Sequence, residues 1–257
     1  MKRTVFSLLT VVALSLLTIV VLLFFACTTK SPERGYHIGW GVIKGEESPF
    51  SIRMDYGSQL YIVENLAPGF EMEDDKRVIV DYSIIEQVSE SVYNVRVNML
   101  YNVLSKPLLA QSYINNEENG IGEDSVGYDP IRVNWARFSG EFLNLGIQVW
   151  MNNNNAPHLI NLVYDDTEGD IEVKGDTALL TLRHNAFDDA KNTLSNEQYA
   201  SFPLSDLILP PATERPVKLT WRDYNGKMLS GTGIFALPST TTAGELRLFF
   251  SAATLVD

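Results

Sequence analysis

Two runs of alternating apolar residues between Tyr128 and Asp166 constrain this chain more than any other stretch. An apolar residue at every second position is typical of a half-buried β-strand, because successive side chains of a strand point to opposite faces. The turn between the two runs, Asn152–Pro157, consists of residues that favour chain reversal. We therefore predict a hairpin of two long strands that opens a second domain.

In the first of these runs, one large aromatic residue lies on the face opposite to the apolar residues. Trp150 alternates with residues that would take the core face, namely Leu143, Leu145, Ile147, Val149 and Met151. If the face of Trp150 is open, this side chain is our candidate for contact with a partner. If that face is covered, the strand is simply buried on both sides.

Further strand patterns follow the predicted hairpin. Val217–Arg222 and Lys227–Phe235 flank Asn225-Gly226, the strongest short hairpin signal in the chain. Ile171–Arg183 also alternates, Leu246–Phe250 could add a last strand, and only Thr193–Ala200 has a weak helical pattern. Many antiparallel strands with turns at regular intervals predict a β-sandwich over residues 128–257.

The first half of the chain has the same period of two. Its strand candidates are Tyr36–Ile43, Phe50–Met54, Leu60–Val63, Lys76–Ile85 and Tyr93–Leu104. In the last of them, the side chains predicted to share the core face are Tyr93, Val95, Val97, Met99, Tyr101 and Val103. Five strands in so short a stretch predict a small barrel of the OB type over residues 36–110. Arg53, Tyr56 and Tyr61 could line its ligand face, or they could be ordinary core and surface residues.

Residues 111–127 have no apolar period and are rich in Gly and acidic residues, which predicts an interdomain linker. A calcium loop is the alternative. However, the acidic and Asn residues of 111–127 do not match the alternate-ligand spacing and the closing Glu of an EF-hand, so we favour the linker.

The first residues have the order of parts of a bacterial lipoprotein signal. Lys2 and Arg3 precede a long apolar run, and Ala26 stands directly before Cys27. We predict a signal peptide over residues 1–26, an acylated Cys27 and a tether over residues 27–35. The run is also long enough to remain as an uncleaved membrane anchor. Either way, the rest of the protein lies outside the cytoplasm. No acidic run follows Cys27, which favours the periplasmic face of the outer membrane over the cell surface.

Composition narrows the choice of partner. The 257 residues are 45% hydrophobic, enough for one large core or two modest ones, and the net charge is −12. Because Lys2 and Arg3 lie in the leader, the exported part is more acidic still, and it repels phosphate backbones. We therefore predict no nucleic-acid partner. The single cysteine cannot form an internal disulfide.

Several segments together resemble the NigD-like lipoproteins of the Bacteroidetes phylum. The matching segments are the Cys27 leader, Lys76–Ile84, Val95–Asn98, Tyr101–Lys106, Asp124-Ser125, Asp129–Val133, His158–Val163 and Leu182–Asp189. The resemblance implies an N-terminal OB domain and a C-terminal β-sandwich, and it implies no established activity. The chain departs from the family over Asn192–Gln198 and beyond Phe235.

Membership of that phylum would also imply a modification. Its exported proteins can carry O-linked glycans on a Ser or Thr that follows Asp and precedes a small or aliphatic residue. Ser125 and Thr177 fit this short pattern.

Catalytic motifs are scarce. The chain has three histidines, and it contains no nucleophile elbow, Walker loop or zinc-protease motif. His184 with Asp188 or Asp189 could bind a metal, although a turn in which Asn185 and the acidic residues bond backbone amides explains the same residues better. The acidic residues of 165–172 could serve a glycosidase, but a solvated turn is the better interpretation.

These observations predict an all-β, membrane-anchored, non-enzymatic binding module of the cell envelope. Its partner would be an unknown envelope protein or glycan, and we predict no cofactor. The alternatives are a glycan-active enzyme that uses carboxylates alone and a protein for self-protection against a bacteriocin.

Overall fold

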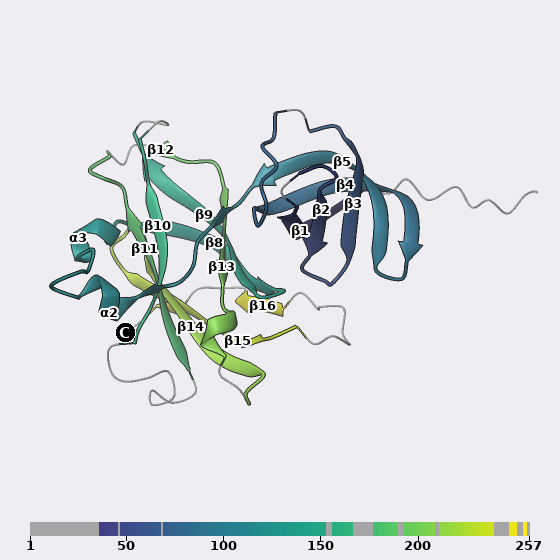
Figure 1. Cartoon of the computed structure of the whole chain (residues 1–257). Helices are drawn as coiled ribbons and strands as arrows, with labels where there is room; N and C mark the ends of the chain where they lie inside the picture. The colour runs from purple at the N-terminus through teal and green to yellow at the C-terminus, as the bar shows by residue number, and fades with distance from the viewer. Residues whose placement is uncertain are drawn as a thin grey trace, which may run out of the picture. The chain divides into compact units, whose positions relative to one another are not determined.

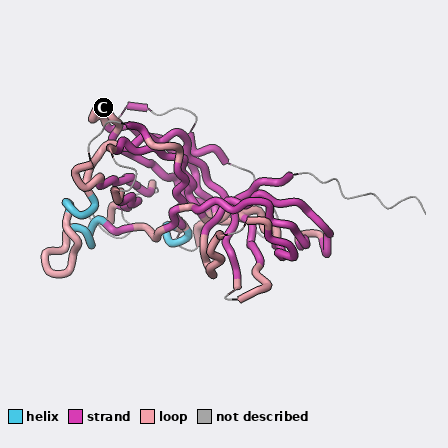
Figure 2. The backbone as a smooth tube through the Cα atoms, turned by 90° about the horizontal axis from the view of Figure 1, so that it is seen from above, coloured by secondary structure: helices cyan, strands magenta, loops and turns pink. Residues whose placement is uncertain are grey.

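The computed structural model describes residues 36–45, 47–67, 69–152, 156–166, 177–189, 193–208, 211–238, 247–250 and 254–255. The predicted signal peptide, tether and Cys27 therefore lie outside the described residues. Within the described part, no helix is long and apolar enough to cross a membrane. Tyr36–Asp257 form one compact unit, and among its described residues helix is confined to short segments (Figure 2).

Five strands at the start of this unit close into a barrel, as predicted, and their order is β1-β2-β3-β5-β4 (Figure 1). They are β1 (Tyr36–Lys44), β2 (Ser51–Met54), β3 (Gln59–Asn65), β4 (Arg77–Ser89) and β5 (Val92–Asn102). Strands β3 and β5 pair in parallel, and the other neighbours are antiparallel. This arrangement confirms the OB-type barrel.

The core face of β5 changes side halfway along the strand. Val95 and Val97 are fully buried in the barrel core, as predicted, whereas Met99 and Tyr101 are exposed. The cause is a β-bulge at Asn98, where the pairing of β5 with β4 shifts by one residue. The prediction that Met99 and Tyr101 share the core face is therefore wrong.

The remaining strands form a sandwich of two sheets. The first sheet has the order β16-β8-β9-β13-β6, with β12 beside β9, and the second has the order β17-β15-β14-β11-β10-β7. The strands are β6 (Leu104–Ser105), β7 (Leu109–Ala110), β8 (Ile131–Ser139), β9 (Phe142–Met151), β10 (Leu159–Tyr164), β11 (Ala178–Asn185), β12 (Thr193–Leu194), β13 (Gln198–Pro203), β14 (Glu214–Arg222), β15 (Met228–Ala236), β16 (Arg247–Phe250) and β17 (Thr254–Leu255). Most neighbours are antiparallel, and β6 with β13, β7 with β10 and β11 with β14 are parallel.

The predicted hairpin across Asn152–Pro157 is wrong. Strand β9 pairs with β8 through a turn at Gly140 and Glu141, and β10 pairs with β11 in the opposite sheet. The chain therefore passes from one sheet to the other between β9 and β10. Alternation identified both strands correctly but carries no information about which strands pair.

Residues 111–127 are not a linker. They contain the short helices α2 (Gln111–Ile114) and α3 (Glu123–Val126). Ile114 and Val126 are buried against Val163 of the sandwich. Strands β6 and β7, just before α2, already belong to the two sheets, so the sandwich begins near residue 104 rather than 128. The helices are too short to produce an apolar period.

The sheets also test three other predictions from the sequence. Thr193–Ala200 contains β12 and the start of β13, so its predicted helical turn is wrong. The Asn225-Gly226 hairpin between β14 and β15 is confirmed, with Gly226 at a φ of 77° that suits glycine. Strands β16 and β17 show that the tail beyond Phe235 does add to both sheets.

Candidate functional site: the junction of barrel and sandwich

The junction is built from the outer face of the sheet that contains β8, β9 and β13. On β8, Ala136 and Phe138 point into the sandwich core. Because strand side chains alternate, Trp135, Arg137 and Ser139 point the other way. The register aligns these three with Gly146, Asn144 and Phe142 of β9, and β13 adds Tyr199 and Ser201 beside Gly146 and Asn144.

The barrel contributes an arginine to this face. Arg77, the first residue of β4, is only 2% exposed. It binds Asp55 in the turn after β2 with two hydrogen bonds, from Nη1 to Oδ1 at 2.5 Å and from Nη2 to Oδ2 at 2.6 Å. Such a two-pronged pair fixes both groups in one geometry.

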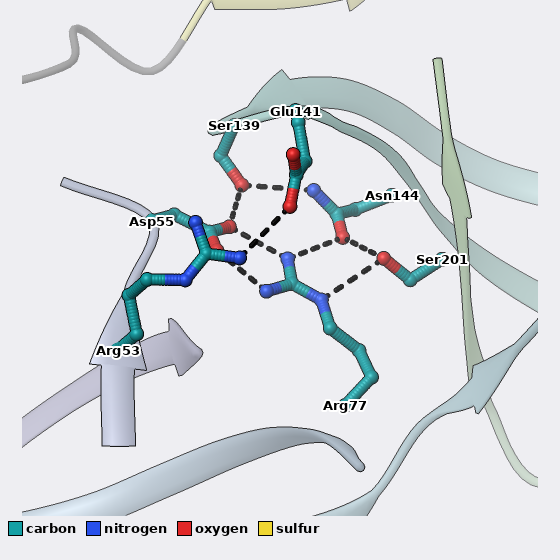
Figure 3. A network of polar contacts seen from close by, with 7 residues as sticks. All are labelled: Arg53, Asp55, Arg77, Ser139, Glu141, Asn144 and Ser201. Atoms are coloured by element: carbon teal, nitrogen blue, oxygen red, sulfur yellow. Dashed lines mark hydrogen bonds and ion pairs between the residues drawn. The ribbon is translucent and has the colours of Figure 1, made fainter. Parts of the chain in front are cut away.

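Three side chains of the sandwich complete the network around this pair (Figure 3). Arg77 donates Nε–H to Ser201 Oγ at 3.0 Å and Nη2–H to Asn144 Oδ1 at 3.1 Å. Ser139 donates its hydroxyl to Asp55 Oδ2. Asn144 then donates Nδ2–H to Ser139 Oγ at 2.8 Å and accepts from Ser201 Oγ at 2.7 Å. Arg77 and Asp55 therefore compensate each other's charge within the barrel, and neutral side chains of the sandwich bind this pair across the junction.

A second, more exposed ion pair lies beside the network. Arg53 Nη2 is 2.9 Å from Glu141 Oε1, and the two side chains are 53% and 33% exposed. Arg53 was a candidate for the ligand face of the barrel. Its guanidinium instead pairs with the turn between β8 and β9 (Figure 3).

Aromatic rings pack beside the polar network. Trp40 of β1 meets Trp135 and Tyr199 edge-on, with ring centroids 6.1 and 5.9 Å away. The Arg77 guanidinium carbon lies 3.9 Å from the centre of the Phe142 ring, and that of Arg137 lies 4.4 Å from the centre of the Trp135 ring. The stack of Arg77 on Phe142 adds cation–π attraction to the ion pair of Arg77 with Asp55, and the stack of Arg137 on Trp135 lies beside it.

One glycine makes this packing possible. A Cβ on Gly146 would lie 2.2 Å from Nε1 of Trp135, so only glycine lets the indole lie across β9.

The chemistry available at the junction is binding rather than proton transfer. Asp55 and Glu141 each have an arginine partner, so neither offers a free carboxylate. Burial is the largest cause that raises the pKa of Tyr56, followed by the charge of Asp55, so its phenol stays protonated at neutral pH. These residues therefore fasten the two domains together.

Sequence reasoning missed most of this site. Arg77 is bonded to Ser201, which is 124 positions away in the chain. The one available signal was Arg77 at the start of an apolar strand, on the face opposite to Val78 and Val80.

The second group of interest is the pair His158 and His184. The rings stack with centroids 5.1 Å apart, and His158 Nδ1 lies 2.8 Å from His184 Nε2. His184 Nδ1 is 3.0 Å from the carbonyl oxygen of Pro130, so Nδ1 carries the proton and Nε2 accepts from His158. The other nitrogen of His158, Nε2, lies 3.2 Å from Asp189 Oδ2. Burial lowers the pKa of His184 to about 4.

These contacts do not fit the metal site that His184, Asp188 and Asp189 could have formed. Both nitrogens of His184 are engaged, and Asp189 Oδ2 also accepts the backbone N–H of Asn152 at 2.8 Å. In the described part of the chain, no cluster of three or more His, Cys, Asp or Glu is arranged to hold a metal. Asn185 Oδ1 accepts from the backbone N–H of Phe187, which is the contact of an Asx turn.

Trp150 is half-buried at the end of β9. Its ring stacks on that of Tyr224, in the turn between β14 and β15, with centroids 4.5 Å apart. Tyr224 is 52% exposed. The face that carries Trp150 is covered at Asn144 and Gly146, so only its end reaches the surface. Tyr61, the remaining candidate on the barrel, is 40% exposed on β3.

The other predicted residues lie apart from the junction. Ser125 is exposed on α3, and Thr177 is half-buried just before β11. Asp166 accepts from the backbone N–H and the hydroxyl of Ser112. The rest of the predicted acidic cluster, beyond Asp166, lies outside the described residues.

Solved structures with the same architecture come from related bacteria. A protein of unknown function from Bacteroides vulgatus is 20% identical, with a TM-score of 0.61 over 80% of this chain and 93% of its own. A NigD-like immunity protein from Bacteroides caccae is 16% identical, with a TM-score of 0.58 over 80% and 98%. A protein named as a candidate lipoprotein of Bacteroides fragilis is 10% identical, with a TM-score of 0.56 over 80% and 99%. At these identities the likeness shows the fold alone.

No curated protein matches the chain. Family comparison matches both domains. Residues 41–103 match the NigD-like N-terminal OB domain, and residues 113–232 match the NigD-like C-terminal β-sandwich domain. The second match begins before α3, which agrees with the place of α3 in the sandwich. The chain belongs to the NigD-like family.

Proposed function

We propose that the protein is an exported lipoprotein, anchored through Cys27, that acts as a non-enzymatic binding module of the cell envelope. One observation carries this proposal. A buried polar network lies at the junction of the two domains, and its charged groups, Arg77 and Asp55, bond to each other. The leader and the candidate lipoprotein among the similar structures support the anchor.

The carboxylates support a binding role over catalysis. A glycosidase of the usual kind needs two carboxyl groups free to act on one bond. Asp55, Glu141 and Asp166 instead accept hydrogen bonds from Arg77, Arg53 and Ser112. The glycan-active enzyme is therefore the weaker alternative.

Self-protection against a toxin is a second candidate function. It is favoured by one observation, the fold shared with a protein named as a NigD-like immunity protein. Both functions require a discrete protein or glycan partner at the envelope. We place the protein at the periplasmic face of the outer membrane.

The partner surface that we propose includes Trp150 and Tyr224. Their stacked rings form a partly exposed aromatic pair at the end of the sandwich away from the turn that carries Glu141. Aromatic residues of this kind are enriched among residues that dominate binding energy. Ser125, exposed on α3, is the stronger of the two proposed O-glycosylation sites, and Thr177 is the weaker. Mass spectrometry of the native protein tests both.

Crosslinking in intact cells, followed by identification of the captured molecules, tests the binding role. We expect a discrete partner whose yield falls in Trp150→Ala and is unchanged in Tyr61→Ala, an exposed aromatic on the barrel. Turnover of an envelope glycan by the pure protein would overturn the proposal.

The anchor has its own test. Cys27→Ser should abolish fatty-acid labelling and move the protein out of the membrane fraction. Unchanged labelling and fractionation would contradict acylation at Cys27.

A further inference from the structure

The outer face of the barrel carries two aligned rows of residues across β1, β4 and β5. In one row Ile38, Asp81 and Met99 are direct neighbours, and in the next row Trp40, Ile79 and Tyr101 are. Tyr36 lies two positions before Ile38 on the same face of β1.

The sandwich covers only part of this face. Trp40 and Ile79 are 6% and 7% exposed, because they pack against Trp135 and Tyr199. Beyond them, Tyr36, Ile38, Met99 and Tyr101 are 80%, 69%, 48% and 41% exposed. We call these four residues the barrel patch. Grouped exposed apolar side chains of this kind mark interaction surfaces.

The bulge in β5 creates half of the barrel patch. Without it, Met99 and Tyr101 would continue the core face of Val95 and Val97. Asn98, at the bulge, donates Nδ2–H to Asp81 Oδ1 at 3.0 Å and to Ser83 Oγ at 3.1 Å, which holds the distorted backbone in place. Bulges commonly re-aim side chains for a purpose.

We propose that the barrel patch rests on the headgroup region of the membrane to which the protein is anchored. This inference rests on the proposed acylation of Cys27. Tyr36 follows Cys27 by nine residues, so the end of the patch at Tyr36 stays within about 30 Å of the lipid even if the tether is fully extended.

The chemistry of the patch fits the headgroup level of a bilayer. Tyrosine is enriched at membrane interfaces, where its ring is buried and its hydroxyl stays hydrated. Asp81, between Ile38 and Met99, keeps the patch out of the hydrocarbon layer. The negative net charge of the exported part favours zwitterionic over anionic lipid.

The experiment uses the single cysteine of the chain. Once Cys27 is acylated, a cysteine introduced elsewhere is the only free thiol. Ile38→Cys and Met99→Cys place a fluorescent label in the barrel patch. Val63→Cys and Val88→Cys are matched controls, because these residues are 57% and 56% exposed on the same barrel outside the patch.

Each acylated, labelled protein is reconstituted in phosphatidylcholine vesicles that contain lipid with a spin-labelled headgroup. We expect quenching several-fold stronger at positions 38 and 99 than at 63 and 88, and a smaller difference when anionic lipid is added. Equal quenching at all four positions in protein that floats with the vesicles would overturn the inference. Another contrary result is a contact between the labels of two protein molecules that increases with protein density while the lipid quenches neither label. That result would overturn the inference and assign the patch to contact with a second copy. Acylation-competent protein that does not float with vesicles would refute the anchor itself, and the inference with it.

Discussion

At the scale of single residues, Arg77 is the most consequential side chain of the junction. It is buried and bonded to Asp55, Asn144 and Ser201. Arg77→Met keeps a long side chain at this position but leaves the Asp55 carboxylate buried without its cation. We expect a loss of about 3–5 kcal/mol in the free energy of unfolding, measured by urea denaturation.

The control for Arg77 is Arg53, which forms the exposed ion pair of the same junction. Because solvent screens such a pair, Arg53→Gln should cost less than about 1 kcal/mol. Equal losses in the two variants would contradict the assignment of Arg77 as the central residue of the junction.

His184 makes the stability of the protein depend on pH. Burial lowers its pKa from the ordinary 6.5 to about 4, so the unfolded chain takes up a proton at a higher pH than the native protein does. Stability is therefore full above pH 6.5 and falls as the pH drops from 6.5 towards 4, by up to roughly 3 kcal/mol. The groups that face this ring are His158 and Asp129, and Asp189 contacts His158.

Denaturant unfolding at a series of pH values measures this effect. His184→Gln should flatten the slope between pH 6.5 and 4, while the same change at His37, in the barrel, should leave the slope in place. A slope that persists unchanged in His184→Gln would refute the role of His184.

At the scale of elements, Gly146 tests the packing of β8 against β9. Gly146→Ala would force the Trp135 ring away from the strand, because the new Cβ would lie 2.2 Å from Nε1. We expect a loss of about 1–3 kcal/mol in the free energy of unfolding and a shift in tryptophan emission.

Gly39→Ala is the matched control. The new Cβ at position 39 would lie 2.5 Å from Cε of Met54. This atom is the flexible end of the side chain and can move aside. The loss should be smaller and the emission unchanged. A larger loss at Gly39 than at Gly146 would contradict the role assigned to the Trp135 contact.

The elements also show what the sequence could predict. Alternation located most of the longer strands, because the period of two follows directly from strand geometry. It missed β6, β7, β12, β13 and β17. It could not predict that β9 pairs with β8 rather than β10, because the alternation of a strand is the same whichever strand pairs with it. It also missed the bulge at Asn98, which depends on bonds to Asp81 and Ser83. One-turn helices such as α2 and α3 are too short for any period.

The junction was harder to predict than the strands. Its bonds join Asp55 to Ser139 and Arg77 to Ser201, pairs that are 84 and 124 positions apart. A single sequence contains no local pattern for such contacts. By contrast, the lipoprotein leader is a local signal, which is why Cys27 could be proposed at once.

At the scale of the whole molecule, the barrel and the sandwich act as one body. Hydrogen bonds from the buried Arg77–Asp55 pair to the sandwich, a ring cluster and the Arg53–Glu141 ion pair join them, and Tyr36–Asp257 form one compact unit. A joined pair of domains can present the barrel patch to lipid and the Trp150 pair to a partner in a fixed relation.

Hydrogen exchange at increasing denaturant concentration tests this central claim most directly. We expect the most protected amides of β4 in the barrel and β11 in the sandwich to lose protection at the same denaturant concentration. In Asp55→Ala, which breaks the junction, the two strands should lose protection separately. Separate loss in the native protein, with the barrel opening while the sandwich stays protected, would contradict the claim.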